Sequence, residues 1–80
     1  MKNYVVAICC FLEPEIKLFK IQAENDYEAV KKGMLEYTPE KYKDDTIELM
    51  NSIDYPKDLK SLIAFYVEME LMFSVIELNN

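Results

Sequence analysis

Residues 4–12 read Tyr-Val-Val-Ala-Ile-Cys-Cys-Phe-Leu, nine apolar side chains in a row. An uninterrupted run of β-branched and aromatic residues is typical of a strand that is covered on both faces or lies at the centre of a small sheet. Glu13-Pro14-Glu15 interrupts the run, because proline removes a hydrogen-bond donor from the ladder. Residues 15–23 predict a second strand, and their interspersed lysines indicate a wetter position near an edge. The short connection makes the two strands an antiparallel hairpin.

Two helices are expected after the hairpin. Asn25-Asp26-Tyr27-Glu28 is a capping-box pattern, and an apolar stripe follows it, formed by Tyr27, Val30, Met34 and Tyr37. Gly33 lies inside this stripe and weakens the helix by about 1 kcal/mol relative to alanine, and a close backbone approach is one explanation for it. Thr38-Pro39 ends the first helix and opens a second. The apolar side of the second helix is predicted to consist of Tyr42, Thr46, Leu49, Met50 and Ile53.

The last third of the chain supports two interpretations. Pro56-Lys57-Asp58 opens a third helical pattern, but residues 63–75 also alternate with period two, so the state of residues 62–70 is ambiguous. We expect a helix to about Tyr66 and a strand from about Met69 to Leu78. The predicted order is ββαααβ, a single α+β domain over residues 1–80. Its small three-stranded antiparallel sheet has helices packed on one face.

The composition excludes several function classes. The chain has 80 residues, 9 lysines, no arginine, no histidine and 15 carboxylates, which gives a formal charge of −6. Without histidine, Ser-His and Cys-His nucleophile pairs are impossible, and one glycine cannot build a phosphate-binding loop. Nucleic-acid binding needs clustered cations, which the acids here outnumber. We therefore expect a non-enzymatic protein with no cofactor and no metal site, which does not bind nucleic acid directly.

Cys9 and Cys10 are adjacent and cannot form a disulfide framework. The favoured interpretation is two small core side chains in a reducing compartment, and the alternative is a redox or intermolecular thiol. The nine-residue apolar run is half of what a membrane span needs, and no cleavage site follows it. These features predict a cytoplasmic protein without a membrane partner.

Acidic side chains are the most distinctive surface feature. Glu40, Asp44 and Glu48 follow an i, i+4, i+8 spacing on the second predicted helix, and Lys41 and Lys43 are within reach of its acids. One interpretation is an ordinary solvated helix face. Another is a negative patch that docks on a basic protein surface, and a third is a cation site at Asp44, Asp45 and Glu48. The candidate partner-binding set contains these acids and two nearby tyrosines: Glu36, Tyr37, Glu40, Tyr42, Asp44, Asp45 and Glu48.

A three-stranded sheet covered on one side leaves its other face exposed. Residues expected on that face are Val5, Ala7, Cys9 and Phe11 or their neighbours, with additions from Met69, Met72, Phe73 and Ile76. Such a face, or an edge strand, is suited to forming a homodimer or receiving a partner. The alternative is that helices and loops cover all of these apolar residues and leave no face of the sheet exposed.

In size, charge and richness in Lys, Asn, Ile and Tyr, the chain resembles products of AT-rich genomes and phage-encoded accessory proteins, including inhibitors of host defence such as anti-CRISPR proteins. The resemblance is one of composition over the whole chain and carries over no residue. It implies a small acidic module that binds a larger protein with a basic surface and blocks it by steric occupation and charge mimicry. The alternative is a self-associating structural or accessory protein that uses the open face or an edge of its sheet.

Overall fold

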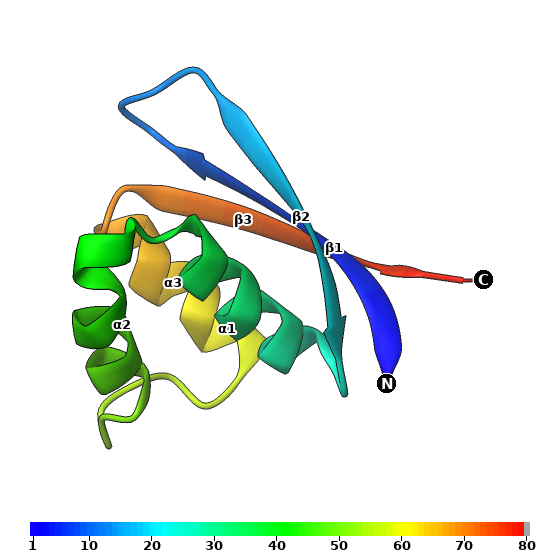
Figure 1. Cartoon of the computed structure of the whole chain (residues 1–80). Helices are drawn as coiled ribbons and strands as arrows, with labels where there is room; N and C mark the ends of the chain where they lie inside the picture. The colour runs from blue at the N-terminus through cyan, green and yellow to red at the C-terminus, as the bar shows by residue number, and fades with distance from the viewer. Residues whose placement is uncertain (80) are drawn as a thin grey trace.

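The computed structural model describes residues 1–79 of the chain. The elements are, in order, β1 (Lys2–Cys10), β2 (Ile16–Ala23), α1 (Asp26–Tyr37), the 3₁₀ turn η1 (Glu40–Tyr42), α2 (Lys43–Met50), α3 (Leu59–Glu68) and β3 (Leu71–Leu78). The helices gather on one side of the sheet and leave its other side bare (Figure 1). The prediction of an α+β fold with ββαααβ order is confirmed.

The sheet has the order β2-β1-β3, and both pairings are antiparallel. The uninterrupted apolar run therefore forms the central strand, as predicted. Tyr4, Val6 and Ile8 point toward the helices and are at most 3% exposed. The strand ends at Cys10, so extending it to Leu12 was wrong: Phe11 and Leu12 lie in the turn and are exposed. Their hydrophobicity does not keep them in the strand because the chain already turns here, with the Glu13 amide donating to the Cys10 carbonyl.

Helix α1 packs across the sheet in the way that its stripe predicts. Asn25 caps it, because the Asn25 Oδ1 accepts from the Glu28 amide at 2.9 Å. Val30 and Met34 are buried. Gly33 lies directly over β1, where an added Cβ would be 2.9 Å from Val6 Cγ1. The close backbone approach considered for this glycine is therefore present.

The second predicted helix is interrupted. Residues 40–42 form a 3₁₀ turn, Tyr42 has φ −111° and ψ 2°, and the α-helix starts only at Lys43. This helix, α2, packs against α1 rather than against the sheet. Placing Ile53 on its apolar side was wrong, because Ile53 lies beyond the end of α2 and is 88% exposed.

An aromatic cluster holds the long α2–α3 connection against α3. Tyr55 in this loop makes edge-to-face contacts with Phe65 and Tyr66, and its hydroxyl is 2.7 Å from that of Tyr66. The Tyr27 hydroxyl also donates to the Pro56 carbonyl at 2.6 Å. The loop therefore adds a buried side chain to the core instead of lying loosely on the surface.

Helix α3 and strand β3 resolve the ambiguous segment. Asp58 caps α3 by accepting from the Ser61 amide at 2.8 Å. The helix continues to Glu68 and the strand starts at Leu71, each within two residues of the predicted boundary. Glu70 makes the tight turn between them with φ 64°, and its carbonyl accepts from the Phe11 amide. This bond joins the α3–β3 turn to the β1–β2 turn.

Candidate interaction surfaces

The acids of the candidate set lie along one part of the surface, which we call the acidic surface: Glu36, Glu40, Asp44, Asp45 and Glu48. Glu36 is near the end of α1, Glu40 is in η1, and the others are on α2, and all five are exposed. Asp44 and Glu48 are four residues apart within α2 and so share one side of it. Glu40 does not continue this row, because the 3₁₀ turn changes the helical repeat before α2 begins.

The lysines next to these acids are engaged elsewhere. Lys43 Nζ donates to the Leu35 carbonyl at 2.6 Å, at the end of α1, where that carbonyl otherwise accepts only the longer 3.3 Å bond from the Thr38 amide. Lys41 Nζ lies 5.0 Å from the centre of the Tyr42 ring. Over residues 1–79, the ion pairs join Lys2 to Glu77 and Lys31 to Glu28, so neither contains an acid of the acidic surface. Lys41 and Lys43, which the sequence places within reach of these acids, therefore form no ion pair with them in the described part of the chain.

The two tyrosines of the candidate set have different surroundings. Tyr42 is 50% exposed and adjoins α2, so part of its ring is exposed beside the acids, with Lys41 over it. Tyr37 is half-buried and packs against the core, and Lys17 Nζ lies 5.9 Å from its ring centre. Burial raises the pKa of Tyr37 above its ordinary value, and the neighbouring Cys10 and Glu13 raise it further. Tyr37 therefore lies beside the β1–β2 turn. One part of its ring packs against the core, and only the rest is available to a partner.

The side of the sheet away from the helices forms a second surface, which we call the open face. The strand pairings assign it twelve residues, four from each strand: Asn3, Val5, Ala7 and Cys9 of β1, Ile16, Leu18, Lys20 and Gln22 of β2, and Met72, Ser74, Ile76 and Leu78 of β3. Four large apolar side chains there are more than half exposed, namely Ile16 at 63%, Leu18 at 69%, Met72 at 52% and Ile76 at 62%. The expectation of an exposed apolar sheet face is confirmed.

Several residues expected on the open face lie elsewhere, and others were missed. Phe11 is in the hairpin turn, Met69 caps the end of α3, and Phe73 faces the helices, where its ring contacts Tyr66. Ile16 and Leu18 were missed, because both faces of the second strand contain apolar and polar residues. Only the pairing of Ala7 with Leu18 and of Cys9 with Ile16 assigns them to this side.

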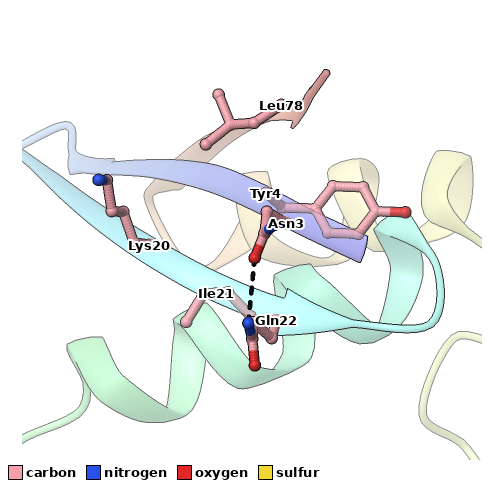
Figure 2. Close-up of a pocket in the computed structure, with 6 residues that line it drawn as sticks. All are labelled: Asn3, Tyr4, Lys20, Ile21, Gln22 and Leu78. Carbon is pink, nitrogen blue, oxygen red and sulfur yellow. Dashed lines mark hydrogen bonds between the residues drawn. The ribbon is translucent and has the colours of Figure 1, made fainter. Parts of the chain in front are cut away.

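The open face has a hollow of about 370 Å³ at the end nearest the N-terminus. Figure 2 shows its lining, with Lys20 and Gln22 on β2, Leu78 on β3, and Asn3 on the central strand between them. Gln22 Nε2 donates to Asn3 Oδ1 at 3.2 Å, so these two amides satisfy each other. The lining supplies one ammonium group, from Lys20, and no carboxylate.

The described residues show few groups that could carry out chemistry. Cys9 and Cys10 are free thiols of intermediate burial. Residues 1–79 contain no group of three or more His, Cys, Asp or Glu side chains placed to hold a metal ion. None of the helices described is long and apolar enough to cross a membrane. No protein-family model, curated protein or solved structure matches this chain.

Proposed function

We propose that this chain is a small, non-enzymatic protein-binding module whose acidic surface docks on the basic surface of a larger protein. The observation that carries the proposal is what Lys41 and Lys43, the two lysines next to these acids, contact. Lys43 caps α1 and Lys41 covers Tyr42, which leaves the carboxylates of α2 exposed without an ion pair. The acidic surface has five carboxylates against the ammonium groups of Lys41 and Lys43, so its net charge stays negative. A negative surface attracts a cationic partner and accelerates their encounter.

The position of α2 supports docking into a groove. α2 packs on α1, one layer away from the sheet, so its outer side projects from the molecule (Figure 1). Its start is held by the Lys43–Leu35 bond and by a 3.5 Å contact between the Thr46 and Thr38 hydroxyls. A surface that is ordered before binding loses less entropy in the complex.

The mechanism that we propose is steric blocking with charge mimicry. Carboxylates on a rigid helix occupy lysines and arginines that would otherwise hold phosphates, and the body of the domain then excludes the nucleic acid. Compositional resemblance to phage-encoded inhibitors of host defence supports this class of partner. The site of action in this proposal is the host cytoplasm.

Reversal of three acids tests the proposal. The variant Glu40→Lys, Asp44→Lys, Glu48→Lys should bind the partner at least about ten-fold more weakly at low salt, because attraction to the basic surface becomes repulsion. The partner is the protein that the parent chain captures from lysate of the source cells at low salt and releases at high salt. Its affinity for each purified variant is then measured by calorimetry.

The matched control reverses three exposed acids outside the acidic surface, Glu24→Lys, Asp54→Lys and Glu68→Lys. It changes the net charge by the same amount, so it separates the location of the acids from the total charge. We expect the control to bind within a few-fold of the parent. Equal affinity of the parent and the Glu40, Asp44, Glu48 variant would refute docking through this surface.

A further inference from the structure

The open face lacks the acidic side chains that are frequent in the rest of the chain. None of its twelve residues is an aspartate or glutamate, although the chain contains 15 of them, and Lys20 is its one charged side chain. Its apolar residues form a continuous area from Ile16 and Met72 at one end to Ile76 near the other. Exposed apolar areas of this kind mark interaction sites.

The distribution of charge decides which face of the molecule can meet a second copy. A chain of formal charge −6 repels a second copy wherever carboxylates meet carboxylates. On the open face two copies can meet without bringing any carboxylates together. We propose that the open face binds the open face of a second copy, which gives a two-fold symmetric dimer with its two sheets packed face to face. Two-fold pairing lets the same surface serve on both subunits.

The size of the open face matches a weak dimer. Three strands of eight or nine residues, spaced about 4.8 Å apart and rising about 3.3 Å per residue, project an area of about 370 Å². Two such faces together project about 740 Å², and protruding side chains raise the accessible area that they bury toward about 1,000 Å². This lies at the lower limit for a specific interface, and we expect a dissociation constant in the micromolar range.

The dimer is compatible with docking through the acidic surface. The helices lie on the opposite side of the sheet, so α2 stays accessible in both subunits (Figure 1). The dimer would then present two acidic surfaces, and neither proposal depends on the other.

Sedimentation equilibrium at protein concentrations from about 10 μM to about 1 mM tests the dimer. We expect reversible monomer–dimer behaviour from the parent chain. The variant Leu18→Glu, Ile76→Glu places charge at the centre of the interface and should raise the dissociation constant at least about 100-fold. Both residues are more than 60% exposed, so the fold should survive, and far-UV circular dichroism checks this.

The control variant, Ile53→Glu, Ile63→Glu, adds the same two charges at apolar residues that are exposed but lie outside the sheet. It should dimerise as the parent does. The proposal is wrong if the parent stays monomeric at about 1 mM, or if the Leu18, Ile76 variant dimerises as tightly as the parent.

Salt dependence separates this proposal from the acidic docking function. Added salt screens the repulsion between two anionic subunits, so the dimer should tighten as salt rises, whereas binding to a basic partner should weaken. The Glu40, Asp44, Glu48 variant should still dimerise. A dimer that dissociates as salt rises would contradict assembly through the open face and leave the docking proposal intact.

Discussion

Gly33 shows how one residue sets the distance between two elements. It is buried in α1 over Val6 of β1, and Val6 is fully buried in the core. The stiff valine side chain cannot rotate away from an added methyl group. The absence of a side chain at Gly33 therefore allows α1 to lie close to the central strand, and the loss of helix propensity is offset by packing.

Gly33→Ala should destabilise the protein by about 1 kcal/mol. The added Cβ would lie 2.9 Å from Val6 Cγ1 and 3.0 Å from Val6 Cβ. Overpacking costs about 1–3 kcal/mol, which exceeds the gain of about 1 kcal/mol in helix propensity. Urea denaturation measures the free energy of unfolding.

The matched experiment repeats the change in a Val6→Ala background. There the methyl group has room, so Gly33→Ala should become stabilising by up to about 1 kcal/mol. If Gly33→Ala stabilises the protein with Val6 present, close packing is not the reason for the glycine.

A hydrogen bond between two buried tyrosine hydroxyls holds the α2–α3 loop against α3. Tyr55 and Tyr66 are 2% and 3% exposed, and their hydroxyl oxygens are 2.7 Å apart. Each hydroxyl needs the other as its hydrogen-bond partner, because a buried polar group without a partner destabilises the folded protein. The bond therefore fixes a loop residue against a helix residue.

Tyr55→Phe should lower the free energy of unfolding by about 1–3 kcal/mol, since it leaves the Tyr66 hydroxyl buried without this bond. The double variant Tyr55→Phe, Tyr66→Phe should recover part of that loss, because both polar groups are then removed. Thermal and urea denaturation of the parent, the two single variants and the double variant measure the coupling.

Tyr42→Phe serves as the control, because the Tyr42 side chain is half exposed and lies outside the core. It should change stability by less than about 0.5 kcal/mol. Additive effects of Tyr55→Phe and Tyr66→Phe would contradict a shared hydrogen bond.

Buried tyrosines make the stability of the whole protein sensitive to pH in the alkaline range. Burial raises the pKa of Tyr55, Tyr66 and Tyr27 above the ordinary value of 10.0. The folded state therefore keeps these phenols protonated at a pH where the unfolded chain has lost their protons. Because the unfolded state then binds fewer protons, the free energy of unfolding should fall as pH rises above about 10.

The urea midpoint measured from about pH 8 to about pH 11.5 tests this dependence. The Tyr55→Phe, Tyr66→Phe variant should show a shallower decline than the parent, because two of the responsible groups are gone. Identical pH profiles for the two proteins would show that the buried pair does not control alkaline unfolding.

Local patterns in the sequence account for much of the fold. Asn25 was recognisable as a helix cap, because a cap bonds to an amide only three residues away. Pro56-Lys57-Asp58 marked the start of the third helix, and the structure shows that Asp58 is its cap. The apolar run of residues 4–12 identified the central strand, although helices cover only the side with Tyr4, Val6 and Ile8. The charge of the acidic surface could also be read directly, because exposed carboxylates on a polar helix need no partner.

Contacts between distant segments were decided by the tertiary structure. Lys43 could be expected to pair with an acid on its own helix, but the η1 turn brings it to the Leu35 carbonyl, where a hydrogen bond closes the end of α1. Leu18 reached the open face only through its register with Ala7. Helix caps and apolar runs depend on neighbours along the chain, so sequence alone determines them. Strand register and lysine partners depend on which segments the core brings together, so only the packed molecule decides them.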